Sequence, residues 1–161
     1  MDYYQNVVVD YLRADRAVFV NTECCIQLID HPNPDRSGLH WYCDAVAVDF
    51  RSKTIFLCEI SYSKSLGALI ERLTAWNQHW PELCDALRRD CSIPADLSVI
   101  RLWLFVPEKS ITALVNRLEA MKAFQPRITS LENVHPWEYS SWNHQDKDTG
   151  KSLVIPEHMR H

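Results

Sequence analysis

The sequence predicts a single α/β domain, of the α+β kind, whose elements run helix, three strands, long helix, strand, helix and short strand. Two segments, 2–14 and 65–89, place apolar residues at the spacing of an amphipathic helix. Between them lie three runs of β-branched and aromatic residues separated by polar breaks, which is typical of a meander. The chain has 161 residues, 47% of them hydrophobic, which is enough for one substantial core.

The chain opens with a predicted helix over 2–14, for which Asp2 is available as the N-cap. The segment 18–28 follows as the first strand, because its polar residues fall on one parity, as in a half-buried strand. The segment 30–38, whose composition is typical of a turn, then leads to the next strand.

Residues 40–50 and 54–63 predict two strands of an antiparallel hairpin, because only a short polar break separates them. Both runs are apolar at nearly every position, so the hairpin is expected in the centre of the sheet, covered on both faces. If the turn closes around Arg51 and Ser52, Asp44 pairs directly with Glu59 and the two side chains share one face.

The second half of the chain predicts a long helix over 65–89, interrupted near Trp80 because Pro81 removes a backbone donor. A buried strand over 98–106 and a helix over about 110–124 follow, and the segment 126–133 adds a short edge strand. We expect one domain over 1–135 and a partly irregular C-terminal extension over 136–161.

Composition excludes several classes of protein. No apolar run approaches the roughly 20 residues that span a bilayer, and the first twenty residues lack the basic start of a signal peptide, so we expect a cytoplasmic protein without membrane contact. The six cysteines do not form the short-spaced pairs of a zinc site and are expected to be reduced thiols. Only three glycines are present, too few for a P-loop or a dinucleotide fingerprint.

The formal net charge of −4 argues against the long basic stripe of a protein that binds DNA without specificity. It leaves room for a local basic groove, formed by Arg88 and Arg89 or by Arg72 beside Gln78 and His79.

The two acids of the hairpin are the main candidates for chemistry. Asp44 and Glu59, a few ångströms apart among apolar strands, would repel one another and lose hydration. A cation or a shared proton would offset this cost, and Mg²⁺ is the simplest cation because it takes carboxylate and water oxygens. The opposing interpretation is that one acid faces solvent near a strand end or pairs with a lysine.

The order helix, three-stranded meander, helix, strand, with an acid in each of the second and third strands, resembles the PD-(D/E)XK nuclease superfamily. Asp44 matches the first acid, and Glu59 in the run Glu59-Ile60-Ser61 matches the second. The resemblance covers residues 2–106 and implies a restriction-endonuclease-like αβββαβ core with a mixed sheet of four to five strands. It also implies that Asp44 and Glu59 bind Mg²⁺ or Mn²⁺ for the hydrolysis of phosphodiester bonds in nucleic acid.

The chain departs from the family pattern at the position of the lysine that helps to polarise the attacking water. Ser61 stands there, and a neutral hydroxyl cannot stabilise developing phosphate charge as an ammonium can. Lys64, three residues further on, is expected to reach the same space, although it is equally compatible with an ordinary solvated position. Cys43 stands where the family has proline, at a position without a chemical role.

Members of the family often add an acid from the first helix and a polar residue from the long helix. Asp10 and Gln78 are the corresponding candidates here, and Glu23 on the first strand is an equally good third acid. Each of the three also has the simple interpretation of a solvated surface residue.

Two functions follow from the resemblance. The first is a Mg²⁺-dependent nuclease or nuclease-related protein; the second is a degenerate member that keeps the fold and binds nucleic acid or a protein partner. A third reading is an unrelated α/β interaction protein in which the acids are incidental. The sequence leaves open whether the protein is an enzyme, whether a substrate is DNA or RNA, and whether the chain forms a homodimer.

Overall fold

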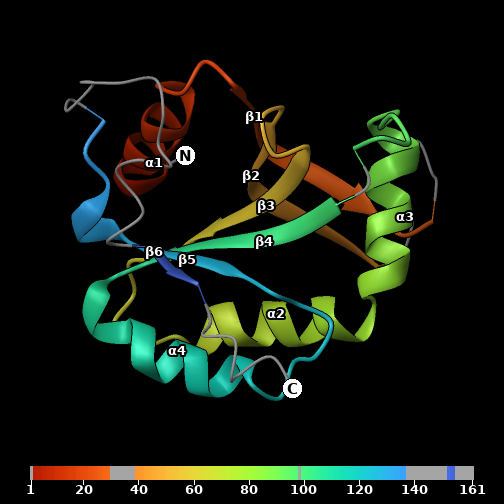
Figure 1. Ribbon diagram of the computed structural model, residues 1–161. Coiled ribbons are helices and arrows are strands. Elements are labelled where there is room, and N and C mark those ends of the chain that lie inside the picture. The colour runs from red at the N-terminus through yellow and green to blue at the C-terminus, as the bar shows by residue number, and fades with distance from the viewer. Residues whose placement is uncertain (1, 30–38, 98, 137–151, 155–161) are drawn as a thin grey trace.

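The computed structural model describes residues 2–29, 39–97, 99–136 and the backbone of 152–154. A six-stranded mixed sheet in the order β1-β2-β3-β4-β5-β6 has helices on both faces (Figure 1). The helices are α1 (Tyr3–Arg13), α2 (Gly67–Gln78), α3 (Trp80–Asp90) and α4 (Ile111–Leu118). The strands are β1 (Val18–Gln27), β2 (His40–Asp49), β3 (Thr54–Ile60), β4 (Val99–Val106), β5 (Arg127–Ser130) and β6 (Ser152–Val154). Short 3-10 turns cover Glu108–Ser110 and Leu131–Asn133.

The first helix begins where its cap was predicted. Asp2 accepts a hydrogen bond from the backbone of Gln5, and the Gln5 side chain accepts one from the backbone of Asp2, which together form a capping box. The helix then buries one apolar stripe against the sheet, made of Val8, Val9, Tyr11 and Leu12.

The strands β1, β2 and β3 form the predicted antiparallel meander. In the hairpin, the pairs run from Asp49 with Thr54 to Ala45 with Cys58, which is the register expected for a turn around Arg51 and Ser52. All seven residues of β3 are buried, so this strand lies in the centre of the sheet.

The predicted interruption of the long helix is present. α2 ends at Gln78 and α3 begins at Trp80, with Pro81 in its first turn, where a missing backbone donor costs nothing. α2 and α3 are separate helices that meet near Trp80, and Figure 1 shows that they run in different directions.

Beyond α3 the sheet becomes parallel. β4 pairs in parallel with β3, and β5 pairs in parallel with β4, which gives the mixed sheet. The predicted helix over 110–124 is shorter than expected, because α4 ends at Leu118. β6, from the predicted C-terminal extension, pairs antiparallel with β5, and the rest of the extension beyond Pro136 lies outside the described residues.

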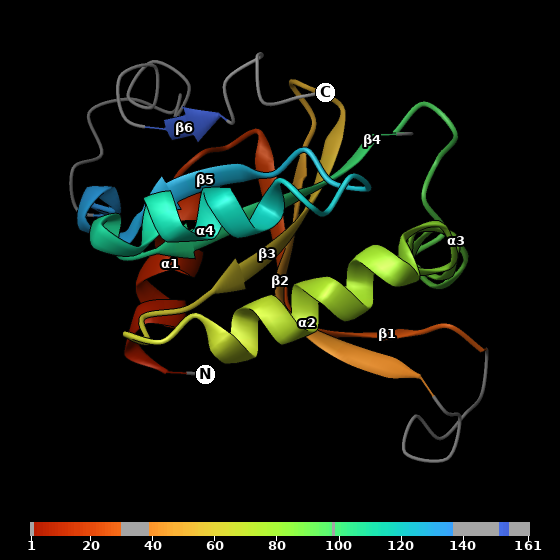
Figure 2. The same ribbon diagram turned by 90° about the horizontal axis from the view of Figure 1, so that it is seen from below.

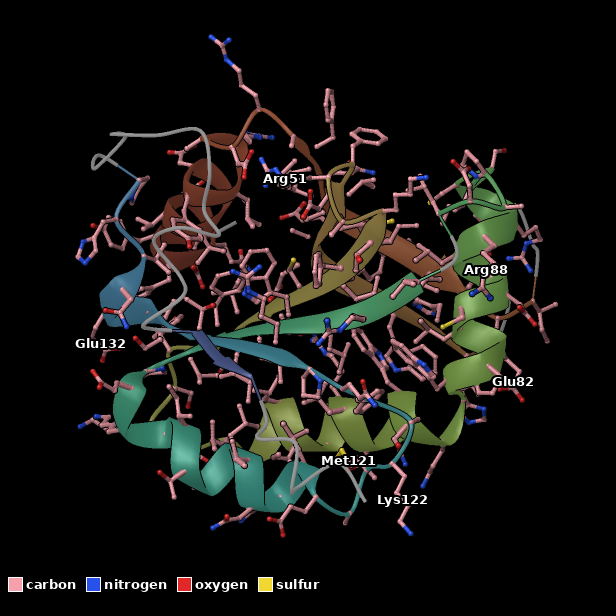
Figure 3. The ribbon with its side chains drawn as sticks, in the orientation of Figure 1. Arg51, Glu82, Arg88, Met121, Lys122 and Glu132 are labelled. Carbon is pink, nitrogen blue, oxygen red and sulfur yellow. The ribbon has the colours of Figure 1, made fainter. Side chains whose placement is uncertain are left out.

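Two hydrophobic cores lie on the two faces of the sheet. The larger one packs α2, α3 and α4 against one face and includes Trp76, Leu73 and Met121; the smaller one packs α1 against the other face. Figure 3 shows the side chains that fill these layers, with Met121 on the side of α2 and α4. Arg51, at the β2–β3 turn, donates to both carboxylate oxygens of buried Asp15 and so ties the hairpin to the end of α1.

In the described part of the chain, no helix has the length and apolar character needed to cross a membrane. All six cysteines are free thiols, and Cys43, Cys58 and Cys84 are buried.

Candidate functional site

Glu59 lies near the end of β3 and is almost completely buried, with 3% of its surface exposed. Its Oε2 accepts a hydrogen bond from Nη1 of Arg72 at 2.6 Å, within an ion pair. Its Oε1 is buried without a hydrogen-bond partner among the described residues. A buried oxygen of this kind is costly unless it carries a proton or meets a cation.

Arg72 comes from α2 and connects that helix to two strands. It precedes Leu73, a buried residue of the helix, and its guanidinium reaches Glu59 on β3. The same Nη1 also lies 3.4 Å from the carbonyl oxygen of Tyr42 on β2. The side chain of Arg72 keeps 39% of its surface exposed, so its charge is accessible from outside.

Asp44 is half-buried in β2 and is held from the other helix layer. Its Oδ1 accepts from Nε2 of Gln5 on α1 at 2.8 Å, and its Oδ2 accepts from the backbone N–H of Ile60 at 2.8 Å. Ile60 directly follows Glu59, so the hydrogen bond to its backbone fixes Asp44 beside the second acid.

The capping box of α1 orients the amide of Gln5. The side-chain oxygen of Gln5 is occupied by the backbone N–H of Asp2 at 2.9 Å, which leaves the amide nitrogen to face Asp44. The start of α1 is therefore connected to the site through one side chain.

The strand ladder is interrupted on both sides of Asp44. In the hairpin, regular pairing ends at Ala45 with Cys58, one residue before Asp44 and Glu59. Between β1 and β2, pairing skips Glu23, which has a φ of 53°, in the left-handed region that residues other than glycine rarely adopt. Breaks of this kind let a side chain leave the regular alternation of a strand, as Asp44 does when it reaches α1.

Asp44, Glu59 and Arg72 line one small open cavity of about 170 Å³. Its other lining residues are Ile60, Ser61, Ala68 and Leu69. The structure thus brings the two predicted acids together at one cavity, although Gln5 of α1 holds Asp44 and Arg72 of α2 holds Glu59.

Burial, together with the negative charge of Asp44, raises the pKa of Glu59 to about 8, although the charge and the hydrogen bond of Arg72 oppose the rise. Burial also raises the pKa of Asp44, against the hydrogen bond from Ile60, the charge of Arg72 and the hydrogen bond from Gln5. The raised pKa favours the protonated form of Glu59 near neutral pH, and Oε1 is the carboxyl oxygen that has no other partner among the described residues.

The other predicted site residues lie at different places. Ser61 lines the cavity, whereas Lys64 is exposed in the loop between β3 and α2 and is not among the lining residues. Asp10 on α1, Gln78 at the end of α2 and Glu23 on β1 are exposed and do not line the cavity either. Gln5 occupies the place expected for Asp10, and Arg72 the place expected for Gln78.

A divalent cation fits the two carboxylates by donor chemistry. Asp44 and Glu59 offer the hard oxygen ligands of Mg²⁺ or Mn²⁺, and Oε1 of Glu59 lacks any other partner among the described residues. Within the described ranges, no group of three or more histidine, cysteine or acidic side chains could hold a metal, so water would complete the coordination of an ion here.

No family model matches this sequence, and no curated protein or solved structure matches it significantly. A function for the chain therefore has to be inferred from the geometry of the site.

Proposed function

We propose that this chain is a metal-dependent nuclease, or a nuclease-related protein, of the PD-(D/E)XK type that acts on phosphodiester bonds of nucleic acid. The observation that carries the proposal is the meeting of Asp44 and Glu59 at one cavity, from adjacent strands of a central hairpin. The element order helix, three-stranded meander, helix, strand supports the similarity to a restriction-endonuclease-like core.

In this proposal, Asp44 and Glu59 hold Mg²⁺ or Mn²⁺ through carboxylate oxygens. The metal, when bound, supplies Lewis-acid charge at the phosphate and a water of lowered pKa. Gln5 and the backbone of Ile60 keep the Asp44 carboxylate in place, so its position does not depend on the ion.

Arg72 supplies the fixed positive charge in this proposal. The resembled family has a lysine where this chain has Ser61, and Lys64 does not line the cavity. The guanidinium of Arg72 does line it and is partly exposed, and its planar set of donors suits phosphate oxygens.

A degenerate module that binds a partner, without hydrolysis, is the second candidate. One observation favours it: the ion pair between Arg72 and Glu59 already places a positive charge on the buried acid, and both Asp44 oxygens already have donors. In that case the cavity is a structural ion-pair site, and the surface around it binds a protein or a nucleic acid.

A cleavage assay separates the two candidates. Labelled single-stranded and duplex oligonucleotides of DNA and RNA are incubated with the protein in Mg²⁺, Mn²⁺ or EDTA. The nuclease proposal expects metal-dependent cleavage that Asp44→Asn and Glu59→Gln reduce by about 100-fold or more, because several kcal/mol of transition-state stabilisation are removed. The matched control is Asp10→Asn, which changes an exposed acid of α1 and should leave the rate unchanged.

If the parent protein cleaves no substrate and binds neither ion, the nuclease proposal fails and the degenerate module stands. If the parent and both site variants cleave equally, the activity does not arise from this cavity.

A further inference from the structure

Three exposed tyrosines gather at the rim of the candidate site. Tyr3, Tyr4 and Tyr62 expose 71%, 40% and 53% of their surfaces. The rings of Tyr4 and Tyr62 are stacked, with centroids 4.7 Å apart and planes at 21°. Tyr3 meets Tyr4 edge to face at 5.4 Å. We call these three side chains the tyrosine platform.

Both segments that carry the platform also carry a residue of the candidate site. Tyr4 immediately precedes Gln5, whose amide binds Asp44, and Tyr62 immediately follows Ser61, which lines the cavity. Figure 2 shows the N-terminal end of α1 beside the loop that joins β3 to α2, the two segments that carry the platform. A chain bound to the platform would therefore lie beside the two segments that supply Gln5 and Ser61 to the site.

Core packing does not account for the platform. The buried stripe of α1 is formed by Val8, Val9, Tyr11 and Leu12, further along the helix. The stack of Tyr4 on Tyr62 joins α1 to the loop between β3 and α2. More than a third of the surface of each of these two residues nevertheless remains exposed. Clustered, exposed aromatic rings of this kind mark surfaces that bind a ligand with flat faces.

The flat faces of the rings indicate which nucleic acid would fit such a surface. The net charge of −4 does not provide the basic stripe with which proteins hold the backbone of a duplex. Stacking depends on the faces of bases instead, and these faces are accessible only when bases are unpaired. Lys64, exposed two residues after Tyr62, adds one positive charge for a neighbouring phosphate.

We propose that the tyrosine platform binds unpaired bases of single-stranded nucleic acid and leads the strand to the carboxylate cavity. This inference rests on the proposed function for its substrate class, and it specifies single strands over duplexes. Stacking on one aromatic ring is worth about 1–3 kcal/mol per base, so loss of a ring should weaken binding by roughly 5- to 150-fold.

The test measures binding without cleavage. A fluorescent oligonucleotide of twelve thymidines, its uridine counterpart and a duplex of equal length are titrated by anisotropy in EDTA, so that metal binding and hydrolysis do not contribute. We expect both single strands to bind more tightly than the duplex. Tyr62→Ala should lose roughly tenfold or more of the affinity, whereas Tyr62→Phe should keep it because the ring remains.

The matched control is Phe19→Ala, which removes an exposed aromatic ring from β1, 63% exposed and outside the platform. It should bind as the parent does, and circular dichroism confirms that each variant is folded. Equal binding by Tyr62→Ala and the parent, no binding to any oligonucleotide, or equal binding to duplex would overturn the inference. Capture of a protein partner without nucleic-acid affinity would also overturn it.

Failure of the platform and failure of the proposed function give different results. If Asp44→Asn abolishes cleavage while Tyr62→Ala binds normally, the nuclease site stands and the platform is wrong. If single strands bind through the platform and no metal supports cleavage, the platform stands and the nuclease is wrong.

Discussion

Glu59 is the residue on which the account depends most. Its buried Oε1 can bind either a proton or a divalent cation, but not both. The pKa of about 8 favours the proton near neutral pH. A cation that binds here must displace the proton, because metal ligands bind in their deprotonated form. Metal binding at this site is therefore linked to pH.

We accordingly expect the affinity for Mn²⁺ to rise between about pH 6 and pH 8, as the proton on Glu59 becomes easier to remove. Calorimetric titrations in two buffers of different ionisation enthalpy should show close to one proton released per ion at pH 7. Glu59→Gln should bind weakly and without this pH dependence. An affinity that is constant over this range would show that Glu59 is not a ligand.

The same residue should make stability depend on pH. Glutamate has an ordinary pKa of 4.5, and in the folded protein burial raises that of Glu59 to about 8. Between these two values the folded protein holds a proton that the unfolded chain has released, so the free energy of unfolding falls as the pH rises. Urea unfolding at several pH values should show this decline in the parent and a smaller decline in Glu59→Gln. Identical slopes would mean that Glu59 titrates normally.

Residue pairing within the hairpin could be predicted from the sequence, whereas the partners from the helices could not. The short turn around Arg51 and Ser52 sets the hairpin register from Asp49 with Thr54 to Ala45 with Cys58, which is a local property. The expected direct pair of Asp44 with Glu59 lies beyond the last pair of this ladder. Arg72 and Gln5 reach the acids because of the rotation of each helix against the sheet, which one sequence does not encode locally. The pattern Asp2-x-x-Gln5 contains a capping signal. The hydrogen bond from the Gln5 side chain to Asp44 depends instead on tertiary packing.

At the scale of elements, α1 contributes to the site through its cap. Asp2→Ala should lower the free energy of unfolding by about 1 kcal/mol, the usual cost of a lost N-cap. Because the backbone N–H of Gln5 loses its acceptor, the first turn that positions the Gln5 side chain is held less firmly, and we also expect Mn²⁺ affinity to fall a few-fold. Asp10→Ala, in the same helix but outside the cap and the cavity, is the control. Equal effects of the two substitutions on Mn²⁺ affinity would disconnect the cap from the site.

The elements themselves were predicted well where a local signal exists and less well where tertiary contacts replace it. Pro81 gave the boundary between α2 and α3. The end of α4 at Leu118 was missed because Met121 and Phe124 continue the apolar pattern into the core after the helix has ended. The backbone N–H of Ala123 instead finds a partner in the side chain of Asn77, an interaction with no sequence signal.

At the scale of the whole molecule, the site lies where the two helix layers meet the end of β3. Gln5 reaches it from the layer of α1 and Arg72 from the layer of α2, so both faces of the sheet must be packed for the cavity to form. Substitutions in the core should nevertheless affect stability without affecting metal binding.

Leu73, fully buried in the larger core, directly follows Arg72 and offers this test. Leu73→Ala should lower the free energy of unfolding by about 2–5 kcal/mol through loss of burial and the cavity left behind. While Leu73→Ala remains folded, its Mn²⁺ affinity should match that of the parent. Arg72→Met should abolish cleavage and should lower the free energy of unfolding by less than Leu73→Ala does. Urea unfolding, calorimetry and the cleavage assay on both variants provide the comparison. Loss of metal binding in folded Leu73→Ala would argue against a preformed site.

Anomalous diffraction from crystals soaked in Mn²⁺ tests directly whether Asp44 and Glu59 hold a divalent cation. A peak within coordination distance of oxygens from both carboxylates, absent from crystals of Glu59→Gln, is the result that the account predicts. Crystals that show no manganese at this cavity at pH 8, or the same peak in the parent and in Glu59→Gln, would contradict it.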